Sequence, residues 1–78
     1  MGSLQNRSTV VIPLGVTVNG QDHEFAPGTS VRTMLGALGL PDTGVAVAVD
    51  GAVLPKSRWD DELGRGWTVE VLTAVQGG

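Results

Sequence analysis

Few residues of this chain have side chains suited to chemistry. The 78 residues include one histidine, His23, and no cysteine. The lack of thiols excludes disulfides, cysteine-ligated zinc, iron–sulfur clusters and a cysteine nucleophile. Metal sites and serine–histidine–aspartate sets need several converging groups, and we expect His23 to lie alone on the solvent side of a strand. The sequence therefore predicts no metal site and no catalytic residue.

The chain ends in Gly77-Gly78, and this pair is its most informative feature. A carboxylate is a poor electrophile, but it becomes reactive as a mixed anhydride with AMP, from which a nucleophile can displace the AMP. Glycine has no Cβ, so a glycine tail can enter a narrow channel, and a frayed end can be presented to a separate enzyme. Two interpretations stand here: the Gly78 carboxylate is the reactive group, or the tail has no role.

The charged residues favour neither nucleic acid nor a membrane as a partner. The formal net charge is -3, from 5 basic and 8 acidic residues, and phosphate binding needs clustered Lys and Arg. The basic residues are instead scattered: Arg7, Arg32, Lys56, Arg58 and Arg65. No apolar run approaches the roughly 20 residues of a membrane span, and residues 1–9 lack a signal-peptide core. We expect a cytoplasmic protein whose mild acidity suits solubility or a basic partner protein.

A β-hairpin is the first element that the sequence predicts. Apolar residues alternate with small or polar ones over 14–18, which is the period of a strand. Asn19-Gly20 follows, a pair typical of a two-residue hairpin turn because both positions need a positive φ. The return strand covers residues 21–26, with Phe25 as its anchor in the core.

One amphipathic helix follows the hairpin. Thr29 or Ser30 can cap its start, because either hydroxyl can accept from a free backbone N–H. Apolar residues then recur at i, i+3, i+4 and i+7, which places them on one helical face against a sheet. They are Val31, Met34, Leu35 and Leu38. Gly39 and Pro41 end the helix.

The second half of the chain predicts three strands and one polar segment. The uncharged run 45–49 favours a strand inside the sheet, covered on at least one side, and Asp50-Gly51 is a second turn. The remaining elements are a short strand at 52–54, a polar turn or loop at 56–63 and a last strand at 68–75. We expect the indole of Trp59 to hold the polar segment against the core.

The order of these elements predicts an α+β protein of the β-grasp, or ubiquitin-like, class. A single helix cannot bury its apolar face alone, so a mixed sheet must pack on it. The predicted divisions are a flexible N-terminal extension at 1–12, a β-grasp domain at 13–75 and a flexible C-terminal tail at 76–78.

Five segments of the sequence carry a family resemblance: 16–20, 27–31, 44–50, 53–59 and 69–78. The most specific are the Pro-basic-x-x-Trp run that ends at Trp59 and the Thr-Ala-Val-Gln-Gly-Gly ending. With them the chain resembles the ThiS family, the small sulfur carrier proteins of thiamin biosynthesis. It is less similar to the molybdopterin synthase small subunits, which tend to have different residues before Gly-Gly.

The resemblance implies what the tail does. An E1-like adenylyltransferase would use ATP to adenylate the carboxylate of Gly78, and sulfur from a cysteine-desulfurase route would replace the AMP. Thiazole synthase would then take sulfur from this C-terminal thiocarboxylate. Gly77 and Gln76 would present the tail. The resemblance thus implies a monomeric carrier and co-substrate, not an enzyme, with no bound cofactor.

Three residues are candidate contacts for a partner. Leu72 and Ala74 alternate away from the apolar side of the last strand, and Leu72 is either exposed for a partner or buried with the rest. Trp67 stands where the family usually has Asp, which indicates either local packing or a contact surface.

Two alternative functions remain at this point. One is a sulfur carrier of another pathway, such as a molybdopterin synthase small subunit or a carrier for cysteine biosynthesis. The other is a ubiquitin-like interaction module in which the terminal Gly-Gly is incidental. The first keeps the chemistry of Gly78, and the second does not need it.

Overall fold

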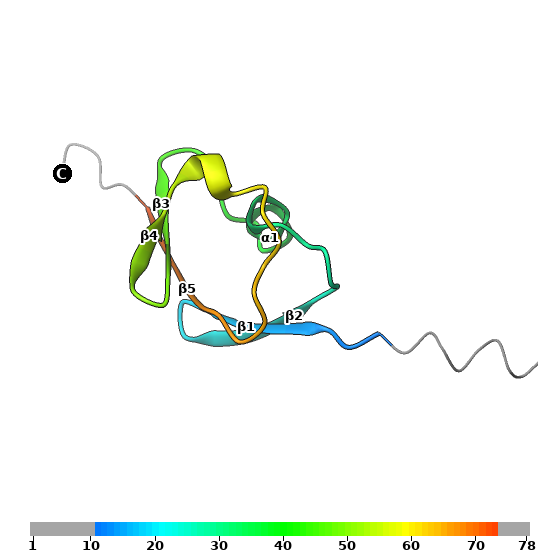
Figure 1. Ribbon diagram of the computed structural model, residues 1–78. Helices are drawn as coiled ribbons and strands as arrows, with labels where there is room; N and C mark the ends of the chain where they lie inside the picture. The colour runs from blue at the N-terminus through cyan, green and yellow to red at the C-terminus, as the bar shows by residue number, and fades with distance from the viewer. Residues whose placement is uncertain (1–10, 74–78) are drawn as a thin grey trace, which may run out of the picture.

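The computed structural model describes residues 11–73, and residues 1–10 and 74–78 lie outside the described part. Five strands form one mixed sheet in the order β2-β1-β5-β3-β4, and α1 lies against one face of it (Figure 1). The elements are β1 Leu14–Val18, β2 Gln21–Phe25, α1 Val31–Ala37, β3 Val45–Val49, β4 Ala52–Leu54, the 3₁₀ turn η2 Lys56–Arg58 and β5 Thr68–Thr73. This is the β-grasp fold that the sequence predicts.

The β1–β2 hairpin forms where the sequence predicts it. Asn19 and Gly20 have φ angles of 50° and 84°, the positive values that a two-residue turn requires. β2 ends at Phe25, one residue before the predicted end, because the chain turns there. Within this turn the carbonyl oxygen of Ala26 accepts hydrogen bonds from the backbone N–H and the hydroxyl of Thr29.

The predicted position of His23 is wrong. Residues opposite each other in an antiparallel pair share a face of the sheet, and His23 pairs with Val16, which is 3% exposed. The imidazole is therefore half-buried on the helix side, with its ring centroid 6.2 Å from that of Phe25. Phe25 anchors this face, and strand alternation places His23, two residues earlier, on the same side. Asp22 and Glu24 point to the opposite side, as predicted.

Helix α1 is capped and buried as the sequence predicts. The hydroxyl of Ser30 accepts a hydrogen bond from the backbone N–H of Thr33 at 3.1 Å, which makes Ser30 the N-cap. Its three fully buried side chains are Val31, Met34 and Leu35. The helix ends before Gly39, whose φ of 72° suits glycine at a helix end. Within residues 11–73 no helix is long and apolar enough to cross a membrane.

β5 is the central strand of the sheet. It runs parallel to β1 and antiparallel to β3. β3 lies between β5 and β4, so it is an interior strand, as its uncharged sequence predicts. Val47 of β3 is fully buried, whereas its neighbour Ala46 is exposed. Among residues 11–73 the sheet is therefore covered on one face only.

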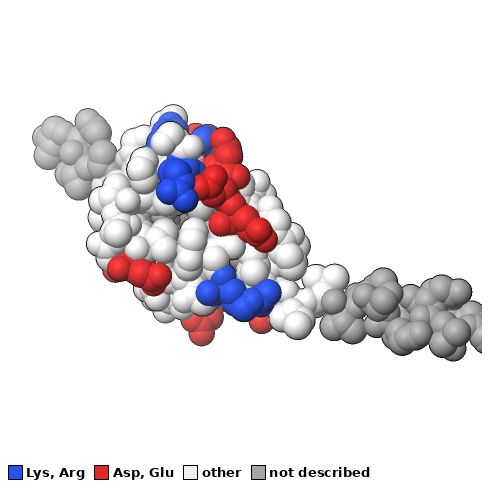
Figure 2. All heavy atoms as spheres, viewed as in Figure 1, with Lys and Arg blue, Asp and Glu red and all other residues white. Residues whose placement is uncertain are grey.

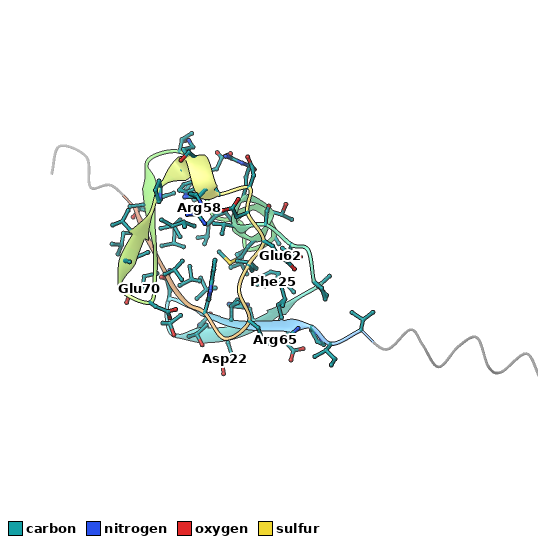
Figure 3. The ribbon with its side chains drawn as sticks, in the orientation of Figure 1. Asp22, Phe25, Arg58, Glu62, Arg65 and Glu70 are labelled. Atoms are coloured by element: carbon teal, nitrogen blue, oxygen red, sulfur yellow. The ribbon has the colours of Figure 1, made fainter. Side chains whose placement is uncertain are left out.

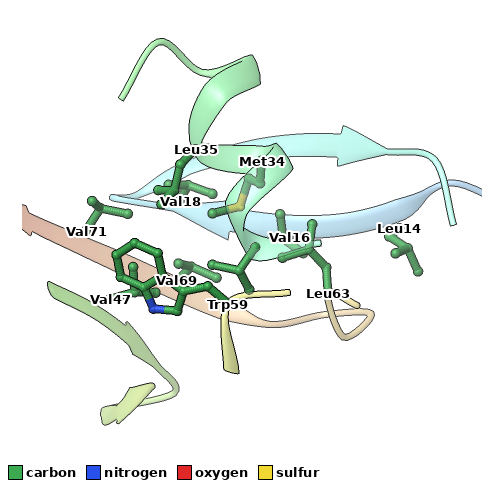
Figure 4. Packing of buried hydrophobic residues seen from close by; sticks show 11 residues of the cluster. Leu14, Val16, Val18, Met34, Leu35, Val47, Trp59, Leu63, Val69 and Val71 are labelled. Carbon is green, nitrogen blue, oxygen red and sulfur yellow. The ribbon is translucent and has the colours of Figure 1, made fainter. Parts of the chain in front are cut away.

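Trp59 closes the core beside the helix. Trp59 directly follows the turn η2, and its indole lies in the core (Figure 4). The residue is 2% exposed. Its Nε1 donates to the carbonyl oxygen of Leu54 at 3.2 Å, so the buried polar atom has a partner. Arg32 and Lys56 lie 5.7 and 5.5 Å from the ring centroid, within cation–π range. The prediction that this indole holds segment 56–63 is confirmed.

Trp67 packs at the start of β5, in phase with the buried residues Val69 and Val71. Its half-buried side chain contacts the core. The indole lies over Gly64, where a Cβ would fall on the ring, 2.7 Å from Cδ1 and closer still to Nε1 and Cε2. Gly64 has no positive φ, so this position needs glycine for space and not for its backbone angle.

We expect Gly64→Ala to lower the free energy of unfolding by about 1–3 kcal/mol, because the added methyl group overpacks against Trp67. Urea denaturation measures the change. Gly36→Ala is the matched control, since a Cβ there meets nothing within 4 Å. Alanine at this helical position should raise the free energy of unfolding by about 0.5–1 kcal/mol. Equal effects of the two substitutions would contradict the packing of Trp67 over Gly64.

Candidate functional site

β5 leads into the C-terminal residues that the sequence singles out. Val69 and Val71 face the core and are 1% and 7% exposed. Thr68, Glu70 and Leu72 alternate with them and are exposed on the other face, away from α1. We call this face of the sheet the outer face. The remaining tail candidates lie outside the described residues, and their roles stay predictions: Ala74, Gln76, Gly77 and Gly78.

Leu72 lies in an apolar part of the outer face. Of the two alternatives for this residue the structure shows exposure, with 60% of its surface accessible. Ala46 pairs with Leu72 across β3 and β5, and Val53, which is 74% exposed, pairs with Ala48 across β4 and β3. Paired residues share a face, and so do alternate residues of one strand. These four residues, Leu72, Ala46, Ala48 and Val53, form the apolar sheet patch.

Sequence reasoning missed Val53, although the turn before it contained the information. A two-residue turn fixes the register of its hairpin. The turn at Asp50-Gly51 therefore places Val53 opposite Ala48. Once Ala48 is assigned to the outer face, Val53 follows it there.

The outer face also carries negative charge. Glu70 pairs with Ala48, and Asp22 and Glu24 occupy the exposed side of β2. Figure 3 shows Asp22 and Glu70 pointing away from the interior, while Phe25 points into it. None of the five strands contains Lys or Arg. The strands therefore place carboxylates on this face and contribute no Lys or Arg side chain beside them.

Two basic side chains, those of Arg32 and Arg58, are paired with acidic ones on the helix side. Arg32 Nε lies 2.9 Å from Asp60 Oδ1, and Arg58 Nε lies 2.6 Å from Asp61 Oδ2. Figure 2 shows basic and acidic atoms side by side in this region, at the top of the view. Surface pairs of this kind contribute about 0–1 kcal/mol each. Because opposite charges lie together there, they partly offset each other.

The candidate contact Trp67 lies away from the outer face, as does His23, to which the sequence assigns no site. Trp67 precedes β5, whereas Leu72 lies near its other end, about 16 Å away at the usual rise of a strand. Their side chains also point to opposite faces, so they do not form one contact surface. His23 lies on the helix side. Within residues 11–73 no three His, Asp or Glu side chains are grouped to hold a metal ion.

The mixed sheet, its single helix and its central last strand define the chain as a β-grasp, ubiquitin-like protein. The chain belongs to the ThiS family, whose sequence model matches residues 16–78. A solved structure, the thiamine biosynthesis protein (ThiS) from Geobacter metallireducens, is similar with a TM-score of 0.69 and 30% sequence identity. The match covers 83% of this chain and 100% of that one. No curated protein matches this sequence.

These matches confirm the family and the fold that the sequence predicts. They support the corresponding function, a sulfur carrier of thiamin biosynthesis. The matched region runs through β5 to Gly78. The match therefore covers β5 together with the residues after it.

We expect Leu72→Ala to change the free energy of unfolding by less than about 0.5 kcal/mol, because Leu72 is exposed. Leu35→Ala makes the same chemical change at a fully buried residue and should cost about 2–5 kcal/mol. Urea denaturation of both variants checks this difference. A comparable loss in both would mean that Leu72 is buried in solution.

Proposed function

We propose that this chain is a sulfur carrier whose reactive group is the terminal carboxylate of Gly78. The family match that extends to this residue is the observation that carries the proposal. The chain has no cysteine, so it cannot hold sulfur as a persulfide on a side chain. The terminal carboxyl group is then the place for the sulfur. In this role the protein is a co-substrate of other enzymes and not itself a catalyst.

Activation of the tail requires ATP because a carboxylate is a poor electrophile. A carboxylate oxygen of Gly78 attacks the α-phosphorus of ATP, and pyrophosphate leaves as the acyl adenylate forms. The outer sulfur of a persulfide from a cysteine-desulfurase route displaces AMP and forms an acyl disulfide. A thiol of the donor system then reduces this disulfide, which releases the thiocarboxylate and leaves the donor as a disulfide. Thiazole synthase consumes the thiocarboxylate. The E1-like adenylyltransferase binds the ATP, so the carrier needs no bound cofactor. Gln76 and Gly77 present the carboxyl group to these enzymes.

The outer face suits a partner that holds the tail. Leu72 is exposed near the end of the described part of β5, and Ala74, the second predicted contact on this strand, lies outside the described residues. A partner seated on the apolar sheet patch would therefore lie beside the last described residues of β5. The carboxylates of Glu70, Asp22 and Glu24 on this face favour a partner surface with Lys and Arg around an apolar centre.

The thiamin pathway is favoured over other sulfur-transfer pathways by the family match and by the similar solved structure. In this assignment the partners are the adenylyltransferase, the sulfur donor system and thiazole synthase. We place the carrier in the cytoplasm with its ATP-using partner.

Incubation with its adenylyltransferase, ATP and a sulfur donor should convert the chain to a thiocarboxylate. Intact-mass spectrometry should then find one oxygen replaced by sulfur, and fragmentation should place the change on Gly78. The control reaction without ATP should leave the mass unchanged. A folded carrier that keeps its mass with its cognate enzyme would overturn the proposal and favour an interaction module.

Deletion of Gly78 is the matched variant for this assay. It should abolish the mass change, because the new terminal carboxylate no longer reaches the position at which the enzyme adenylates the tail. The urea denaturation curve should stay that of the full chain, since glycine has no side chain to bury in a core. Thiocarboxylate formation at Gly77 in this variant would show that the enzyme does not require a tail of this length.

Glu70→Lys should slow association with the adenylyltransferase by about two- to fivefold at low salt, because it places a positive charge beside the apolar sheet patch. The difference should shrink as the salt concentration rises. Stopped-flow measurement of the association rate tests this. Asp42→Lys is the control, because Asp42 lies after α1, 3.9 Å from Arg32. An equal loss of rate in both variants would contradict docking on the outer face.

A further inference from the structure

The pairing between β1 and β5 ends before β5 does. The parallel register joins only Thr17 to Thr68 and Val18 to Val69, after which β1 turns away at Asn19. β5 continues to Thr73. Along this last stretch, β3 pairs with β5 on one side, and no described strand lies on the other side. The part of β5 nearest the tail therefore lacks half of the backbone partners of a central strand.

The side chain of Asn19 takes the place of the missing strand. The backbone N–H of Asn19 donates to the carbonyl oxygen of Val69 at 2.9 Å. Its side-chain Oδ1 accepts a hydrogen bond from the backbone N–H of Val71 at 2.8 Å. Val71 is 7% exposed, and a buried N–H without a partner is destabilising. One residue thus binds β5 at two successive positions on the side that β1 has left.

Few residue types can do this at position 19. The φ of Asn19 is 50°, a left-handed angle that only Gly, Asn and Asp adopt readily. Glycine would allow the turn but has no side-chain acceptor. Asparagine and aspartate combine the angle with an oxygen that can reach the neighbouring strand.

We propose that Asn19 is a positioning residue, which anchors the end of β5 and thereby sets the direction in which the C-terminal tail leaves the sheet. The role in positioning rests on the proposed function, in which a partner must receive that tail. An anchored strand end limits the directions of the tail before the partner binds. Without the anchor, the partner has to order this end of β5 during binding, which weakens the encounter.

The second turn of the sheet provides a matched control. Asp50 has a φ of 49° and precedes Gly51, so it occupies the same kind of turn position as Asn19. Its Oδ1 accepts from the backbone N–H of Thr68 at 3.1 Å. Asp50 thus also binds β5 with its backbone N–H and its side-chain oxygen, but both bonds go to Thr68, at the end of the strand far from the tail.

The test compares Asn19→Gly with Asp50→Gly, because both keep the positive φ and remove one side-chain bond to β5. Amide hydrogen exchange by NMR should accelerate roughly five- to tenfold at Val71 in the first variant and at Thr68 in the second. Asn19→Asp retains an acceptor oxygen and should restore protection at Val71. Unchanged exchange at Val71 in Asn19→Gly would overturn the anchor.

Kinetics of thiocarboxylate formation test the positioning role. Asn19→Gly should raise KM for the carrier about threefold or more with kcat within about twofold, because the loss falls on binding. Asp50→Gly should leave KM unchanged at a similar loss of stability by urea denaturation, and Asn19→Asp should recover the KM. An equal rise in KM for Asp50→Gly would reduce Asn19 to a structural role. A wild-type carrier that gains no sulfur would overturn the proposed function and the positioning role with it, while exchange at Val71 still decides the anchor.

Discussion

In the part of the chain that the structure describes, the sheet has a layer over only one of its faces, and the rest of this part depends on that asymmetry. α1 has seven residues, about 10 Å of helix, whereas the five strands span roughly 20 Å across the sheet. The helix alone cannot cover that width. Trp59 and Leu63, from the segment after β4, fill the remaining space and are 2% and 3% exposed. This packing closes the core in a chain that has no cysteine for a disulfide.

The same asymmetry leaves the outer face open beside the tail. Every strand must place alternate residues in the core, so the positions between them are free to serve another surface. On β3 these positions hold the small residues Ala46 and Ala48, which keep the centre of the face low between Leu72 and Val53. Such a surface can be approached closely by a partner. Leu72 pairs with Ala46 of β3, and Val71, its neighbour in sequence, is buried in the core, so Leu72 is held facing outward.

Local patterns made most of the fold predictable, because hairpin turns and helix caps are decided by neighbours in sequence. The Asn19-Gly20 turn and the Ser30 cap follow from residues a few positions apart. The second role of Asn19 does not, since its side chain binds Val71, 52 positions further on. The alternation with Phe25 places His23 on the core side, whereas its polar type alone favours the solvent side. The pairing between strands decides such cases, and a single sequence indicates that pairing only indirectly.

The charges of the outer face explain how an exposed apolar patch can be tolerated. An uncovered apolar sheet surface favours self-association. Two copies that met through this face would bring the carboxylates of Glu70, Asp22 and Glu24 together, and the net charge of -3 adds to their repulsion. A partner with Lys and Arg at the same positions would reverse the sign of this interaction. The same carboxylates therefore oppose pairing of the carrier with itself and favour a basic partner, which gives a physical reason for strands without a single Lys or Arg.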